Sequence, residues 1–84
     1  MNTEATRLGD REIYLLGVLA ERNDIIKIGP GRLPRGCDDT HARALLEVGY
    51  AVENAYRLAD GRDERLYQIT RKGMDAWRSY RFVH

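Results

Sequence analysis

Cysteine is nearly absent from this sequence, since Cys37 is the only one in 84 residues. A single cysteine forms neither an internal disulfide nor a cysteine-cluster zinc site, so we expect a reduced, cytoplasmic protein. Histidine is also scarce, with two residues, while zinc needs three or four ligands. The sequence therefore predicts no metal centre and no cofactor.

The chain also lacks a long apolar run. The longest stretch covers only Ile13–Leu16, whereas a membrane span needs roughly 20 apolar residues. The N-terminal residues do not contain the apolar core of a signal peptide. We therefore expect no membrane partner.

Neither sign of charge dominates, because the net charge is +1. The distribution is more informative: residues 25–37 hold three basic side chains and no acid, whereas residues 38–64 hold seven acids and three arginines. Arginine makes up 12 of the 14 basic residues, and its guanidinium suits bidentate contacts with phosphate, guanine or carboxylate. No arrangement of nucleophile, base and acid indicates catalysis, so we do not expect an enzyme.

Apolar spacing predicts a first helix that follows a flexible lead-in over residues 1–9. Asp10 is its expected N-cap, and Asn23-Asp24 is expected to end it. Residues 10–84 are long enough for one small domain with a modest core. A wide apolar stripe places this helix at the centre of that core, through Ile13, Leu15, Leu16, Val18, Leu19 and Ala20.

A short β-branched stretch, Ile25–Ile28, predicts a strand that pairs with a later hairpin. Residues 29–36 follow, and their two prolines and three glycines forbid a long helix. We expect an irregular loop here, with at most a single turn around Arg32.

The next helix is predicted over residues 38–48. The sequence leaves open whether Asp38, Asp39 or Thr40 is the N-cap. Gly49 suits the left-handed residue that ends a helix. Helical spacing gives an inward face of Ala42, Leu45, Leu46 and Gly49, and an outward face of Thr40, Arg43, Ala44 and Glu47.

A β-hairpin follows, with Asp60-Gly61 at the centre of a type I′ turn. This register puts apolar residues opposite each other on one face and opposite charges on the other, as cross-strand pairing favours. It predicts three opposed pairs, which are Val52 with Ile69, Asn54 with Tyr67, and Arg57 with Glu64. A longer loop over Ala59–Glu64 is the alternative.

Thr70 is expected to cap a last helix. Gly73 lies inside that helix, where it costs about 1 kcal/mol relative to alanine, so we expect a close approach to another backbone segment. Gly73, Ala76, Trp77 and Tyr80 share one face, and Trp77 is interpreted as a core residue. The predicted order of helix, short strand, irregular loop, helix, β-hairpin and helix is an α+β fold.

Two linked motifs resemble the winged helix-turn-helix superfamily. Leu45–Val52 matches a leucine-rich recognition helix that ends in a Leu-x-x-x-Gly pattern, and Tyr67–Gly73 matches the Tyr-x-Leu-Thr-x-x-Gly pattern that follows the wing. Over residues 40–77 the chain is similar to bacterial regulators of the MarR and PadR type. The resemblance implies a winged-helix domain in which residues 38–48 approach the major groove of DNA.

The resemblance and the charge pattern together give the candidate DNA contacts. On the recognition helix they are Thr40, His41 and Arg43. Phosphate contacts are expected from three groups: Lys27, Arg32 and Arg35 in the loop, Arg57, Arg62 and Arg65 in the wing, and Arg71 and Lys72 in the last helix.

Structural roles compete with several of these contacts. Thr40 is also a candidate cap, and Arg43 is also placed to pair with Glu47 one helical turn later. The wing arginines are near Asp60, Asp63 and Glu64, so local ion pairs are an alternative to phosphate contacts.

We therefore expect a small DNA-binding protein, a transcriptional regulator with double-stranded DNA as its partner. The alternative is a winged-helix protein–protein interaction module, such as an adaptor, an anti-activator or a polymerase-binding factor. Three features favour the alternative: the net charge is close to zero, residues 29–36 replace the full helix that the superfamily has there, and Asp38 with Asp39 would repel phosphate. The oligomeric state stays open, with a homodimer contact through Arg78–His84 as one alternative.

Overall fold

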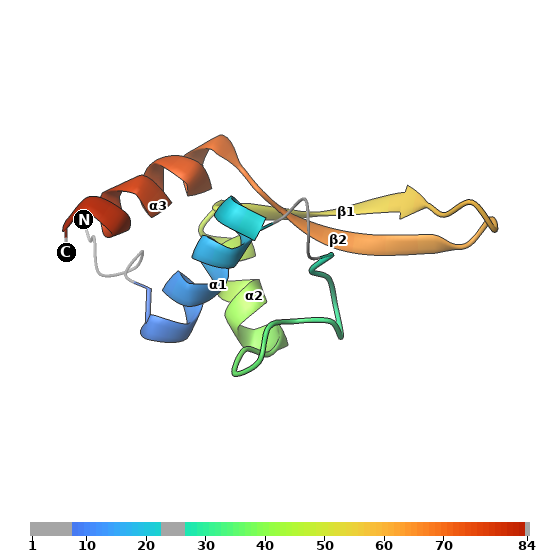
Figure 1. The fold of residues 1–84 in the computed structure, drawn as a ribbon, viewed down its shortest axis with the longest axis horizontal. Helices are drawn as coiled ribbons and strands as arrows, with labels where there is room; N and C mark the ends of the chain where they lie inside the picture. The colour runs from blue at the N-terminus through green and yellow to red at the C-terminus, as the bar shows by residue number, and fades with distance from the viewer. Residues whose placement is uncertain (1–7, 23–26, 84) are drawn as a thin grey trace.

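Three helices gather at one end of the molecule, and a long β-hairpin projects from them (Figure 1). The computed structural model describes residues 8–22 and 27–83. The hairpin accounts for the elongated shape, with principal extents of 45, 24 and 23 Å. The predicted α+β class is confirmed, and the elements are α1 (Asp10–Arg22), α2 (Asp39–Glu47), β1 (Ala51–Arg57), β2 (Asp63–Ile69) and α3 (Arg71–Val83).

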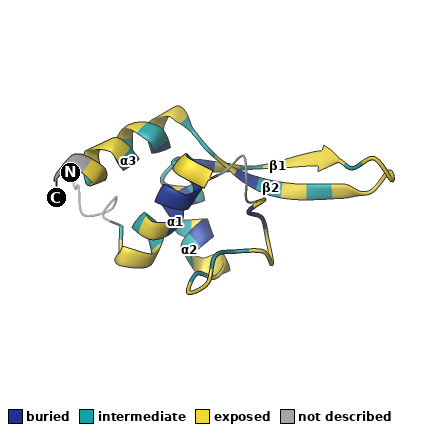
Figure 2. Cartoon of the chain, in the orientation of Figure 1, coloured by how far each residue is buried: buried dark blue, intermediate teal, exposed yellow. Residues whose placement is uncertain are grey.

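The core forms where α1 packs against α2 and α3. α1 contributes an unbroken buried stretch, Leu15–Leu19, as its apolar stripe predicts. Leu45 of α2, Ile28, and Ala51 with Tyr67 at the base of the hairpin complete the core. Burial is concentrated in this region, while the outer part of the hairpin is exposed (Figure 2). Full burial of one such leucine is worth about 1.5–3 kcal/mol.

Helix α1 is capped one residue earlier than the sequence predicts. The Gly9 carbonyl accepts the first helical hydrogen bond from the Ile13 N–H at 3.0 Å, and the Glu12 carboxylate accepts one from the Gly9 N–H at 2.6 Å. Gly9 is therefore the N-cap, and Asp10 is the first helical residue. The prediction for Asp10 was wrong because Glu12 satisfies the cap from inside the helix, which is half of a capping box. Residues 1–7 of the predicted lead-in lie outside the described residues.

Only the second half of the short strand expected at Ile25–Ile28 lies within the described residues. Ile25 and Ile26 lie outside the described residues, and Lys27 and Ile28 are not in a strand. The Ile28 carbonyl nevertheless accepts a hydrogen bond from the Tyr67 N–H at 2.9 Å. Ile28 therefore lies at the edge of β2, in line with the predicted pairing with the hairpin, although neither Lys27 nor Ile28 is in a strand.

The loop over residues 29–36 contains no helix, as predicted, and consists of two tight turns. Gly31 has φ 79° in the first, which is closed by the Arg32 N–H donating to the Gly29 carbonyl at 2.9 Å. Gly36 has φ 89° in the second, which is closed by the Cys37 N–H donating to the Pro34 carbonyl at 3.0 Å. Both turns have glycine in the third position, where a positive φ is needed, and the first also has Pro30 in the favoured second position, so residues 29–36 form turns and no helix.

Helix α2 has the predicted position and inward face. It spans Asp39–Glu47, with Asp38 as its N-cap, and buries Ala42 and Leu45. It ends where Gly49 adopts φ 82°, as predicted, and the chain passes directly into β1. None of the three helices, as far as the chain is described, is long and apolar enough for a membrane crossing.

The register of the hairpin differs by one residue from the prediction. Ala51 pairs with Ile69, Val52 with Gln68, Asn54 with Leu66 and Arg57 with Asp63. The loop causes the shift: the Leu58 N–H donates to the Arg62 carbonyl, and three residues ending in left-handed Gly61 lie between them instead of the two of a type I′ turn. Every side chain of β1 therefore changes its opposed partner, and Ala51 instead of Val52 is buried.

The base of the hairpin is fastened to α3 through Thr70. The Thr70 hydroxyl accepts from the Gly73 N–H at 3.0 Å, which is the predicted cap, and donates to the Gly49 carbonyl at 2.7 Å. The predicted close approach of Gly73 is confirmed, because a β-carbon there would lie 2.1 Å from the Tyr50 carbonyl oxygen. Trp77, which was interpreted as a core residue, is half-buried and packs against the core cluster.

Candidate nucleic-acid interface

The outward face of α2 carries the candidate groove-reading residues. Thr40 and Arg43 are exposed, while Ala42 and Leu45 hold the opposite face in the core. Arg43 makes neither a hydrogen bond nor an ion pair with any residue that the structure describes, so the alternative pairing with Glu47 does not form. Its guanidinium is free to meet an external anion.

His41 has a structural role at the start of α2. Asp38 caps the helix through its carboxylate, which accepts from the Thr40 N–H at 2.9 Å. The His41 Nδ1 accepts a hydrogen bond in return from the Asp38 N–H at 3.0 Å, which completes a capping box. Thr40 is thus not the cap, and His41 offers only its Nε2 to a ligand. The sequence missed this role because a capping box usually carries Glu or Gln at that position.

Tyr67 is a further residue that sequence reasoning did not assign to the site, although two residues of α2 act on it electrostatically. It is buried at the base of the hairpin. Burial raises the pKa of its phenol, Asp39 and Glu53 raise it further, and Arg43 lowers it. Asp39 and Arg43 therefore both act electrostatically on Tyr67. The signal available in the sequence was that Tyr67 begins the Tyr67–Gly73 motif.

The loop residues separate into free and paired cations. Arg32 donates from Nη2 to the Glu64 carboxylate at 2.8 Å, which ties the loop to the hairpin. Lys27 and Arg35 are exposed and make no ion pair within the described parts of the chain. Two of the three predicted phosphate contacts in the loop are thus available.

The wing arginines form ion pairs, as the alternative interpretation stated. The pairs are Arg57 with Asp63 at 3.1 Å, Arg62 with Asp60 at 2.7 Å, and Arg65 with Glu53. With Arg32 paired to Glu64, every acid of residues 51–69 has an arginine partner. Such exposed pairs are each worth only about 0–1 kcal/mol, so phosphate can compete for the arginines.

Arg71 and Lys72 lie at the start of α3. Arg71 is exposed. The Lys72 Nζ lies 5.7 Å from the centre of the Tyr50 ring, a cation–π contact that covers the corner between α2 and β1. Lys72 is therefore engaged by the protein itself, whereas Arg71 extends into solvent.

Cys37 and His41 do not form a reactive pair. The Cys37 thiol lies 3.7 Å from the Arg11 carbonyl oxygen. Burial raises the pKa of the thiol, Arg11 lowers it, and Asp38 and Glu12 raise it, so the net shift disfavours the thiolate. Within the described residues, no group of three His, Cys, Asp or Glu side chains is placed to hold a metal ion.

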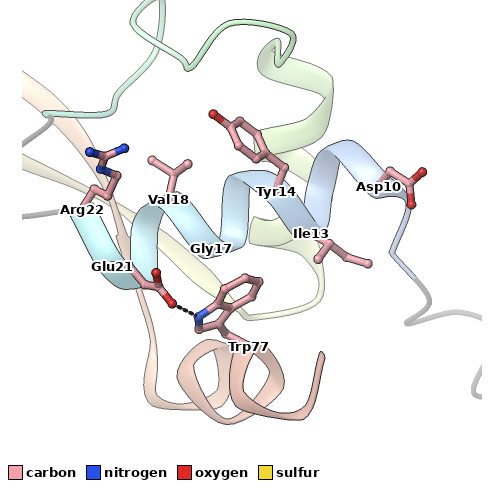
Figure 3. A pocket seen from close by; sticks show the side chains of 8 residues that line it. All are labelled: Asp10, Ile13, Tyr14, Gly17, Val18, Glu21, Arg22 and Trp77. Atoms are coloured by element: carbon pink, nitrogen blue, oxygen red, sulfur yellow. Dashed lines mark hydrogen bonds between the residues drawn. The ribbon is translucent and has the colours of Figure 1, made fainter. Parts of the chain in front are cut away.

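A groove on α1 lies outside the candidate interface (Figure 3). Trp77 closes one side of it, and its indole Nε1 donates to the Glu21 carboxylate at 2.9 Å. The ring packs so closely on Gly17 that a β-carbon there would lie 2.7 Å from it. The groove therefore lies along the contact between α1 and α3.

Comparisons with models of known protein families, with curated proteins and with solved structures find no match for this chain. The class is accordingly defined by the fold alone: a small α+β protein whose described residues form three helices and an antiparallel hairpin.

Proposed function

We propose that this chain is a small winged-helix DNA-binding protein that regulates transcription. The observation that carries the proposal is the outward face of α2, where exposed Arg43 makes no hydrogen bond or ion pair with the described residues. α2 leads through Gly49 directly into a projecting hairpin, which is the order of recognition helix and wing. In this arrangement α2 enters the major groove, and Arg43 contacts a guanine edge or a phosphate.

The free cations supply the electrostatic part of binding. Lys27 and Arg35 contact phosphates beside the groove, and the paired wing arginines exchange carboxylate for phosphate where the backbone comes within reach. Three phosphate contacts correspond to a slope of about −3 when the logarithm of affinity is plotted against the logarithm of salt concentration. Weak binding with a shallow salt dependence is thus expected.

Arg43→Ala is expected to weaken binding to a short DNA duplex by about tenfold at low salt and to lower the slope by about 1. Arg35→Ala should do the same. Fluorescence anisotropy titrations at several salt concentrations measure both quantities. Arg78→Ala is the matched control, because it removes the same charge from the exposed surface of α3 and should leave affinity within about twofold.

Asp39→Asn is expected to strengthen binding by about threefold to tenfold, because it removes an acid from the start of the recognition helix. Asp38 caps the helix, so this variant leaves the cap intact. An unchanged affinity for Asp39→Asn, or no binding by the unmodified protein below the high micromolar range at low salt, would refute the DNA-binding proposal.

A second function is favoured by the charge pairing of the hairpin. Because each acid of residues 51–69 has an arginine partner, the wing presents a neutral surface, which suits a protein partner better than a phosphate backbone. A winged-helix interaction module then predicts a stoichiometric protein complex from the native host, with no affinity for DNA in the same titrations.

A further inference from the structure

The outer edge of β1 presents unpaired backbone groups. The Leu58 N–H donates to the Arg62 carbonyl, and the Thr70 N–H donates to the Tyr50 carbonyl, so residues of even number in β1 direct their backbone groups toward β2. The odd-numbered residues Glu53, Ala55 and Arg57 consequently direct theirs away from β2. No backbone hydrogen bond links these three to any other segment that the structure describes.

The two edges of the hairpin differ in this respect. The edge of β2 is covered near its base, because the Tyr67 N–H donates to the Ile28 carbonyl. A β-carbon at Gly29 would lie 2.2 Å from the Arg65 carbonyl oxygen, which shows how closely this segment follows β2. Residues 54–57 of β1, by contrast, are all exposed (Figure 2). An edge of this kind is a template for another strand.

We propose that a second copy of this chain pairs antiparallel along β1, with Ala55 opposite its counterpart on the two-fold axis. The two hairpins then form one continuous four-stranded sheet. Residues 53, 55 and 57 exchange backbone hydrogen bonds with residues 57, 55 and 53 of the second copy. This surface is separate from Arg78–His84, and the proposal does not depend on DNA binding.

Charge favours this register over the two others in which an outward-facing charged residue of β1 would lie on the axis. An axis at Ala55 places Glu53 opposite the second copy's Arg57, and Arg57 opposite the second copy's Glu53. An axis at Glu53 would oppose two carboxylates, and an axis at Arg57 would oppose two guanidinium groups, which is unfavourable in a sheet. Edge strands that avoid pairing commonly carry charges that repel a copy, whereas the charges of β1 are self-complementary.

The existing ion pairs leave atoms free for the new ones. Arg57 uses its Nε for the Asp63 carboxylate at 3.1 Å, so its terminal nitrogens can donate to the second copy's Glu53. Glu53 binds Arg65 through one carboxylate oxygen, and its other oxygen can accept from the second copy's Arg57. Each arginine at position 57 then lies between two carboxylates across the sheet.

The other face of β1 supplies apolar surface. Val52 and Tyr56 are exposed at 43% and 37%, and with Tyr14 they are the large apolar side chains that stand exposed among the described residues. In the proposed register Val52 lies opposite the second copy's Leu58, and Tyr56 lies opposite its Asn54. Pairing thus covers the apolar side chains that the one-residue shift in register left in solvent.

Ala55→Pro tests the contribution of the backbone hydrogen bonds of β1 to dimer formation. Proline removes the outward N–H of residue 55 but no hydrogen bond to β2, so the hairpin should keep its far-ultraviolet circular dichroism. Sedimentation equilibrium should show a concentration-dependent dimer for the unmodified chain and at least about tenfold weaker association for Ala55→Pro. Ala59→Pro is the matched control, because residue 59 lies in the turn, and it should associate like the unmodified chain.

Charge exchange tests the register. Glu53→Arg and Arg57→Glu should each associate at least about tenfold more weakly than the unmodified chain, because like charges then face each other twice. An equimolar mixture of the two variants should form a heterodimer, since every facing pair is again of opposite charge. A monomeric unmodified chain at millimolar concentration, a dimer unaffected by Ala55→Pro, or a mixture that stays monomeric would each overturn the proposal.

Discussion

Replacing Gly73 with alanine is expected to lower the free energy of unfolding by about 2–3 kcal/mol. The new β-carbon would lie 2.1 Å from the Tyr50 carbonyl oxygen and 2.7 Å from the Ile69 side chain. The Tyr50 carbonyl cannot move freely, because it accepts a hydrogen bond from the Thr70 N–H at 2.9 Å. Alanine would gain about 1 kcal/mol of helix propensity, which is too little to offset this clash.

Urea unfolding followed by circular dichroism measures this change. Gly31→Ala is the control, since it also adds one methyl group to a glycine, but into open space at φ 79°. Its expected cost is about 1 kcal/mol, from the left-handed backbone alone. Equal losses of unfolding free energy for Gly73→Ala and Gly31→Ala would contradict the close approach of α3 to Tyr50.

Replacing Leu45 with alanine is expected to cost about 3 kcal/mol, within the range of about 2–5 kcal/mol for buried leucines. Leu45 has no exposed surface and lies in the core cluster with the leucines of α1. Domains of this size have unfolding free energies of only about 4–12 kcal/mol, so the loss is a large fraction of the total. Because Leu45 lies on the same helix as Arg43, the nucleic-acid binding that we propose should weaken together with stability.

The matched comparison is Leu46→Ala, the same change one residue later on a half-buried side chain. It is expected to cost less than Leu45→Ala, about 1–2 kcal/mol, because less apolar surface is lost from the core. Thermal and urea unfolding of the two variants compare these costs. An equal cost at both positions would contradict the assignment of Leu45 as the residue that holds α2 in the core.

Local signals predicted the elements that hold the site. The end of α2 followed from Gly49, the start of α3 from Thr70, and the tight contact at Gly73 from the cost of a glycine inside a helix. Each of these features depends on a few consecutive residues and their backbone preferences. The capping box involving His41 is equally local, but it uses an uncommon side chain and was missed.

The sequence predicted which types of residue form the candidate site, but not which ion pairs those residues make. The sequence named the loop and wing arginines, yet Arg32 pairs with Glu64 across 32 residues, a contact that only the fold brings about. The loop reaches Glu64 because Ile28, just before it, is hydrogen-bonded to Tyr67 of β2. Nothing local therefore distinguishes Arg32 from Arg35, which makes no ion pair within the described residues.

By itself, the sequence determined an α+β chain with a buried first helix, a second helix between Asp38 and Gly49, a hairpin and a capped last helix. Those properties come from apolar periodicity, caps and glycines, which act over short distances. The tertiary structure alone decided the register of the hairpin, the burial of Ala51 instead of Val52, and which arginines remain free. The reason is that one additional loop residue moves every cross-strand partner, and ion pairs form only between side chains that the register and the packing bring together.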